Sequence, residues 1–64
     1  MTFETFYTFD ELDAIAAFLS TFEDGATTEE ILDAAFEITG REFTSALTEE
    51  QAQCFWDEWV DCVW

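Results

Sequence analysis

The chain is 64 residues long, half of its residues are apolar and 19% are aromatic, and its formal net charge is −15 because Arg41 is its one basic residue against 16 acidic residues. The length is that of one domain, residues 1–64, close to the lower limit for a core without disulfides or metals. The aromatic content excludes a disordered acidic tail, and a single arginine cannot form a surface that binds nucleic acid directly.

Targeting and membrane signals are missing as well. No basic segment precedes an apolar run, and no apolar run approaches the roughly 20 residues that span a bilayer. Anionic lipid surfaces should repel so acidic a chain. Cys54 and Cys62 would lie about 12 Å apart along one helix, beyond disulfide reach. We therefore expect reduced thiols, no membrane partner and a cytoplasmic location.

The N-terminal segment TFETFYTF, residues 2–9, alternates well enough to predict a short strand. Phe3, Tyr7 and Phe9 would then share one side of it. A connector at 41–46 is the candidate for a second short strand that pairs with the first.

Three helices are predicted because three segments begin with a capping box, in which a threonine hydroxyl caps the helix and the side chain three residues later reaches back. They cover about 9–21, 28–39 and 49–63 and begin at Thr8-x-x-Glu11, Thr27-x-x-Glu30 and Thr48-x-x-Gln51. The side chains spaced to face the core are Leu12, Ile15, Ala16 and Leu19, then Ile31, Leu32, Ala35, Phe36 and Ile38, and finally Ala52, Phe55, Trp56, Trp59 and Val63.

Two glycines mark the ends of the first two helices. Residues 23–25 (EDG) predict a turn, and Gly40 suits a left-handed C-cap. The predicted fold is therefore mainly α, a compact three-helix domain, with α+β as the alternative if segments 2–9 and 41–46 form strands.

Neither catalysis nor specific metal binding is indicated. The chain has no histidine, and carboxylates that act as general acid and base need environments that separate their pKa values. An EF-hand aligned on Gly25 would place Ser20 and Ile31 at its first and last ligand positions, where carboxylates are required. We expect no enzyme and no cofactor, and weak calcium buffering by crowded carboxylates stays an alternative.

Acidic residues recur at helical spacing instead. Glu29, Asp33 and Glu37 are four positions apart, so their carboxylates would form a column with steps of about 6 Å. Like charges at this spacing destabilise a helix, and an ordinary solvated surface would include lysines, of which this chain has none. The candidate partner-binding residues are Asp10, Asp13, Glu23, Asp24, Glu29, Glu30, Asp33, Glu37, Glu50, Asp57, Glu58 and Asp61.

The column approximates the spacing of phosphates along a nucleic-acid strand, which predicts a protein that mimics DNA and occupies the basic groove of a DNA-binding protein. Other interpretations stay open. The helix macrodipole favours acids in first helical turns, such as Glu29, Glu30, Glu49 and Glu50, whatever their function. A halophilic surface would also lack lysines, and an acidic-aromatic activation segment or a small acidic interaction module would share the composition.

In length, charge and aromatic content the whole chain resembles the small acidic anti-CRISPR proteins of phages and mobile elements that act as DNA mimics on type I effector complexes, with type I-C a plausible target. Residues 9–37 (FDELDAIAAFLSTFEDGATTEEILDAAFE) also resemble one acidic helical module of the anti-restriction ArdA family. The resemblance implies an inhibitor in the cytoplasm of a host bacterium, without catalytic residues, that competes with DNA for a CRISPR effector subunit or a restriction enzyme.

Three residues fall off the predicted apolar faces. Phe18, Cys62 and Trp64 are therefore candidates for an exposed contact with a partner or with a second copy of the chain. We expect a monomer rather than a homodimer.

Overall fold

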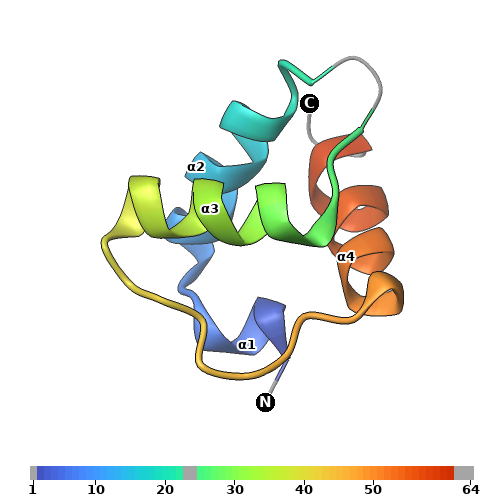
Figure 1. Ribbon diagram of the computed structural model, residues 1–64. Coiled ribbons are helices and arrows are strands. Elements are labelled where there is room, and N and C mark those ends of the chain that lie inside the picture. The colour runs from blue at the N-terminus through green and yellow to red at the C-terminus, as the bar shows by residue number, and fades with distance from the viewer. Residues whose placement is uncertain (1, 23–24, 62–64) are drawn as a thin grey trace.

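The computed structural model describes residues 2–22 and 25–61. These residues form a compact all-α domain, in which α3 lies across α2, while α4 and the following π-helix pack beside them and α1 lies at the base (Figure 1). The elements in chain order are α1 (Phe3–Phe6), α2 (Phe9–Leu19), α3 (Thr28–Thr39), α4 (Glu49–Phe55) and the π-helix η1 (Trp56–Val60). Among residues 2–22 and 25–61, none of the helices combines the length and the hydrophobicity that a membrane span requires.

The predicted N-terminal strand at 2–9 is wrong, because α1 and the start of α2 occupy this segment. Thr2 caps α1 by accepting from the amide of Thr5, whose hydroxyl in turn accepts from the amide of Thr2. Phe3 and Tyr7 do face the same side and are buried. Residues four apart share a side in a strand and also in a helix, so their spacing could not distinguish the two.

The predicted strand at 41–46 is also wrong. No strand occurs in the described residues, so this segment has no partner with which to form a ladder. It runs as an irregular connector from α3 to α4, and the hydroxyl of Tyr7 donates a 2.9 Å hydrogen bond to the carbonyl oxygen of Arg41. Phe43 anchors the connector because its ring is buried in the core.

The prediction for the first helix is confirmed, with α2 ending two residues earlier than expected. Its buried residues are the four predicted from spacing: Leu12, Ile15, Ala16 and Leu19. Gly40 has φ 72°, which confirms the left-handed C-cap of α3. The predicted turn at 23–25 includes two residues that lie outside the described ranges.

The buried face of α3 differs from the predicted one. Ile31, Ala34 and Ala35 are buried, whereas Phe36 and Ile38 are exposed, so the prediction was wrong for these two side chains. Small alanines let α3 lie close to α2. Phe36 is rotated about 100° from Ala35 around the helix axis and therefore leaves the packed side.

The predicted third helix exists within the described residues, but it changes from α4 to the π-helix η1 at Trp56. The amide of Asp61 donates to the carbonyl of Trp56, five residues earlier. An α-helix would place residues five apart about 140° from each other, whereas a π-turn brings them nearly into line. Phe55 and Val60 are both buried for this reason. The two tryptophans of this segment are only partly buried, and the predicted core residue Val63 lies outside the described residues.

Threonine caps begin all three longer α-helices. The capping boxes predicted at Thr8-x-x-Glu11 and Thr27-x-x-Glu30 are present in both directions. The capping box predicted at Thr48-x-x-Gln51 is only half present, because the Thr48 side chain accepts from the amide of Gln51 but the Gln51 side chain does not accept from the amide of Thr48. The Oε1 atom of Gln51 is buried without a hydrogen-bond partner among the described atoms.

Candidate functional site

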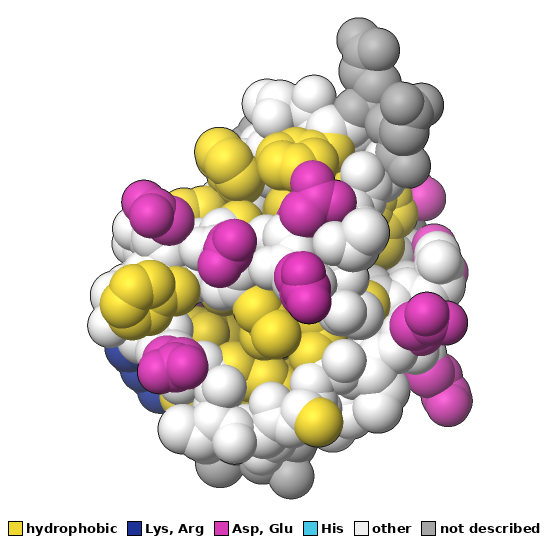
Figure 2. Space-filling model, in the orientation of Figure 1, with side chains coloured by type: hydrophobic (Ala, Val, Ile, Leu, Met, Phe, Trp, Pro, Cys, Tyr) yellow, Lys and Arg dark blue, Asp and Glu magenta, His cyan; other side chains and the backbone are white. Residues whose placement is uncertain are grey.

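The exposed side of α3 carries the predicted carboxylate column. Glu29, Asp33 and Glu37 are all exposed, and they occur one every four residues along a helix that is packed on its other side by Ile31 and Ala35. Figure 2 shows acidic side chains spread along α3 on this face of the molecule. The column is therefore fixed by the burial of the opposite side of the helix.

Two acidic residues near helix starts have local structural partners. Glu30 Oε1 accepts a 3.0 Å hydrogen bond from the amide of Thr27, and Glu11 Oε1 accepts a 2.9 Å bond from the amide of Thr8. The hydrogen bond from the Thr8 backbone lowers the pKa of Glu11, and the nearby charge of Arg41 lowers it further. Glu30 thus serves as a cap, although it also borders the acidic column.

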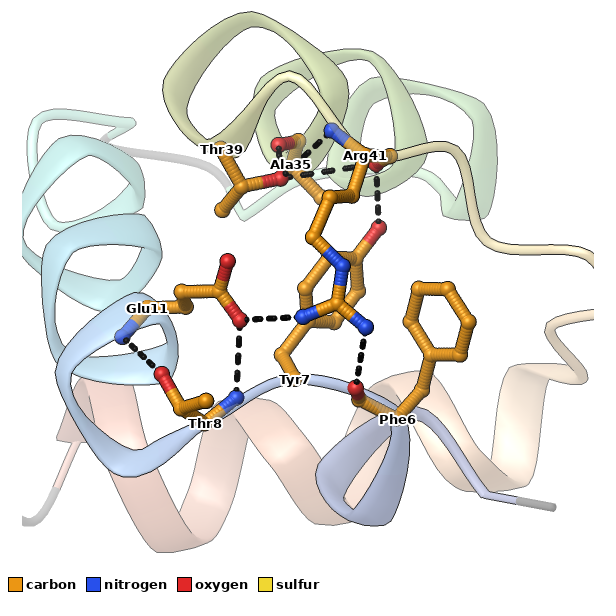
Figure 3. Close-up of polar contacts among 7 residues, drawn as sticks. All are labelled: Phe6, Tyr7, Thr8, Glu11, Ala35, Thr39 and Arg41. Atoms are coloured by element: carbon orange, nitrogen blue, oxygen red, sulfur yellow. Dashed lines mark hydrogen bonds and ion pairs between the residues drawn. The ribbon is translucent and has the colours of Figure 1, made fainter.

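The only basic side chain of the chain is engaged within the fold (Figure 3). Arg41 donates from one terminal nitrogen to Glu11 Oε1 at 2.7 Å and from the other to the Phe6 carbonyl at 3.1 Å. Its guanidinium carbon also lies 4.6 Å from the centroid of the Phe6 ring, a cation–π distance. Arg41 therefore joins the connector after α3 to the α1–α2 junction.

The remaining predicted site residues lie on other elements. Asp10 and Asp13 are on α2, where Asp10 is exposed and Asp13 is half-buried. A second acidic group is defined by its position in the chain, on α4, on η1 and on the residue that follows η1. This group comprises Glu50, Asp57, Glu58 and Asp61, all exposed. Glu23 and Asp24 lie outside the described residues. The predicted residues that the structure describes are thus distributed over α2, α3, α4, η1 and the residue after η1.

One acidic contact was missed by the sequence analysis. The indole nitrogen of Trp59 donates to Glu4 Oε2 at 3.1 Å, across 55 positions of sequence. Partial burial raises the pKa of Glu4, and the neighbouring Glu58 raises it further, while the Trp59 hydrogen bond acts in the opposite direction. No local pattern could have indicated this pair, because only the tertiary fold brings α1 against η1.

Large apolar side chains are also exposed. Phe18, predicted to be off the core face, is 47% exposed, and Phe9 and Phe36 are 72% and 53% exposed. Phe9 still packs edge-on against Trp59 with 5.0 Å between ring centroids, and Phe18 packs against Phe22. Of the other predicted contact residues, Cys62 and Trp64 lie outside the described ranges. Phe36 is the exposed ring that borders the acidic column.

A small groove separates α3 from the connector that follows it. It has a volume of about 230 Å³ and is lined by Leu32, Asp33, Phe36, Glu42 and Phe43. Figure 2 shows hydrophobic side chains in this hollow, next to the acidic side chains over α3. Within residues 2–22 and 25–61, no three Asp, Glu, Cys or His side chains are arranged to hold a metal ion.

Searches with protein-family models, against curated proteins and against solved structures found no match to this chain. The chemistry of the surface is therefore the guide to the function of this protein. That surface combines a carboxylate column on α3, a second acidic group on α4, η1 and Asp61, and the small groove beside α3.

Proposed function

We propose that this protein inhibits a bacterial DNA-binding defence complex by acting as a DNA mimic. The observation that carries the proposal is the exposed column of Glu29, Asp33 and Glu37 on α3. The one basic side chain of the protein, Arg41, is paired with Glu11. A surface selected only for solubility would mix both signs of charge, since unpaired repulsion reduces stability. The cost in stability supports a functional requirement for negative charge.

The mechanism is competition for a basic groove. Carboxylates that step by about 6 Å along α3 take the place of successive phosphates against the Lys and Arg side chains of the target. The summed negative field speeds the encounter with a basic surface, and this acceleration weakens as salt is added. No chemical step is needed, because occupation of the groove by itself excludes DNA.

The target class follows from the resemblance of the chain to small acidic inhibitors of phages and mobile elements. We propose a type I CRISPR effector complex, such as type I-C, in the cytoplasm of the host bacterium, with a restriction enzyme as the alternative target. The inhibitor would act as a monomer without cofactor or catalysis. A small acidic protein-interaction module is a second candidate, favoured by the exposed Phe36 ring beside the column.

The test is a charge exchange on α3 with a charge-matched control. Asp33→Lys/Glu37→Lys alters exposed positions and should leave folding within about 0.5 kcal/mol per substitution. The control, Asp57→Lys/Asp61→Lys, makes the same change in net charge on η1 and the residue that follows it. Fluorescence anisotropy would measure how each variant competes with labelled target DNA for a purified type I-C effector complex.

We expect the α3 variant to lose competition and the control to retain most of it. A folded α3 variant that competes as well as the wild type would show that α3 is not the mimic face. Equal loss in both variants would show that total charge matters and the column does not. If the wild-type protein does not compete with DNA for CRISPR effectors or restriction enzymes, DNA mimicry is wrong.

A further inference from the structure

The groove beside α3 has an apolar floor and an acidic rim. Phe43 is buried and Leu32 is partly buried, so together they form an apolar base. The ring of Phe36, 53% exposed, forms one wall. The volume of about 230 Å³ is below the usual range for pockets that hold small-molecule ligands, but it suits one inserted apolar side chain.

The charges around the groove are all negative. Asp33 and Glu42 line it, and Glu37 is exposed one turn beyond Asp33 on the same helix. Arg41 is adjacent to Glu42 in sequence, but its guanidinium donates to Glu11 and to the Phe6 carbonyl. The one basic side chain of this protein is therefore paired with Glu11 and forms no ion pair with Asp33 or Glu42.

This charge pattern selects the occupant. A second copy of the chain would bring another formal charge of −15 against the rim, so self-association through the groove is disfavoured. An apolar residue with cationic neighbours satisfies the floor and the rim together, because the side chain fills the groove while the cations meet Asp33 and Glu42.

We propose that this groove binds a protein segment in which one large apolar side chain is flanked by Lys or Arg residues. The inference deepens the proposed function and rests on it for the identity of the partner as a basic DNA-binding protein. DNA offers no apolar side chain and no groove of this kind. The contact would therefore let the inhibitor distinguish its target from other basic surfaces, which carboxylates alone recognise by charge.

Two pentapeptides of equal charge provide the probe. One has leucine between two pairs of arginines and the other has serine at that position, and both are acetylated and amidated. Titration of ¹⁵N-labelled protein, followed by amide chemical shifts, would measure each affinity and locate each binding surface. We expect the leucine peptide to bind at least about fivefold more tightly, since partial burial of a leucine is worth that factor. Its shift changes should concentrate at Leu32, Phe36 and Phe43.

The matched variants are Phe36→Ala, in the groove, and Phe18→Ala, an aromatic of similar exposure on α2. Phe36→Ala should remove the preference for the leucine peptide, while Phe18→Ala should retain it. Circular dichroism would check the fold of both variants. A preference for leucine that survives Phe36→Ala would overturn the proposal, as would equal binding of the two peptides or a leucine-induced dimer.

The groove and the proposed DNA mimicry can be tested independently of each other. Loss of DNA competition in Asp33→Lys/Glu37→Lys tests the mimicry, whereas the leucine preference tests the groove without any DNA or target complex. If the protein competes with DNA but shows no preference for the leucine peptide, the proposed DNA mimicry is supported and the proposed role of the groove is wrong. If the protein prefers the leucine peptide but does not compete with DNA, the proposed role of the groove is supported and the proposed DNA mimicry is wrong.

Discussion

The indole nitrogen of Trp59 donates a 3.1 Å hydrogen bond to Oε2 of Glu4 and so ties the π-helix η1 to α1. The bond places a carboxylate in a partly buried position beside a second acid, Glu58. Burial and this like charge raise the pKa of Glu4, because both disfavour the ionised form. The contact between α1 and η1 therefore makes the stability of the domain depend on pH.

We predict that the domain becomes more stable on mild acidification from pH 7. The folded pKa of Glu4 is raised above the ordinary 4.5, so its stabilising contribution is complete below that value and is lost as pH rises through the folded pKa. Glu11 has a lowered pKa, so its contribution is present above the ordinary value and is lost as pH falls through the folded one. Thermal melts should therefore show maximum stability at mildly acidic pH.

The substitution Glu4→Gln isolates the contribution of Glu4 to the pH dependence of stability. It keeps an oxygen to accept from Trp59 and removes the charge, so it should raise the melting temperature at pH 7 and change little near pH 3.5. The control, Glu50→Gln, removes an exposed charge on α4. If both variants raise the melting temperature at pH 7 equally, the increase comes from the lower net charge and not from the position of Glu4.

The second prediction concerns salt. The repulsion among exposed carboxylates is screened over about 10 Å at 0.1 M salt and about 3 Å at 1 M. The melting temperature should therefore rise substantially from low salt to 1 M sodium chloride. A halophilic surface would respond in the same way, so this experiment tests the energetics of the fold without distinguishing functions. A flat curve would contradict the repulsion argument.

The third prediction concerns the aromatic core. The ring of Phe55 is fully buried and lies 5.0 Å from the ring of Phe3 between centroids. Phe55→Ala should cost about 3–5 kcal/mol. A domain of this size is stable by only about 3–10 kcal/mol, so the variant should be largely unfolded at 37 °C by circular dichroism. Phe18→Ala, at an exposed position, should stay folded. Cooperative melting of Phe55→Ala at the wild-type temperature would contradict the packing described.

The fourth prediction concerns Gln51. Its Oε1 atom is buried without a hydrogen-bond partner among the described atoms, and such a group costs about 1–3 kcal/mol. Gln51→Met keeps the shape of the side chain and removes the polar atoms, so it should raise the melting temperature by several degrees. Gln53→Met, at an exposed position on the same helix, is the control; it removes only the exposed 2.8 Å hydrogen bond from Gln53 Nε2 to Asp57 Oδ1 and should not raise the melting temperature. A lower melting temperature for Gln51→Met would mean that the amide has a partner in solution.

The sequence predicted the three longer helices well because each begins with a threonine cap and continues for several turns with helical spacing. It did not predict α1, since Thr2 is paired with Thr5 and not with the Glu or Gln of the usual capping box. It placed Phe36 in the core because apolar residues occur on several sides of α3. Which side is buried depends on how α3 crosses α2, and that is a tertiary property.

The candidate site likewise has features that the sequence predicts and features that only the tertiary fold creates. The exposure of Glu29, Asp33 and Glu37 follows from the periodicity of α3 and was predictable. The groove was not, because Glu42 and Phe43 reach Leu32 and Phe36 only when the connector folds back along the helix. The internal role of Arg41 was equally hidden, since its partners belong to the α1–α2 junction, about 30 positions earlier.

The π-turn of η1 marks a point where the chain could change in length. A π-turn contains one residue more than the α-helical turn that it replaces. Deletion of Glu58, an exposed residue of η1, would place Phe55 and Val60 four positions apart, the spacing that aligns side chains in an α-helix. Both side chains could then keep their buried positions in a continuous helix. Among related sequences, a single-residue gap is therefore best tolerated within 56–60.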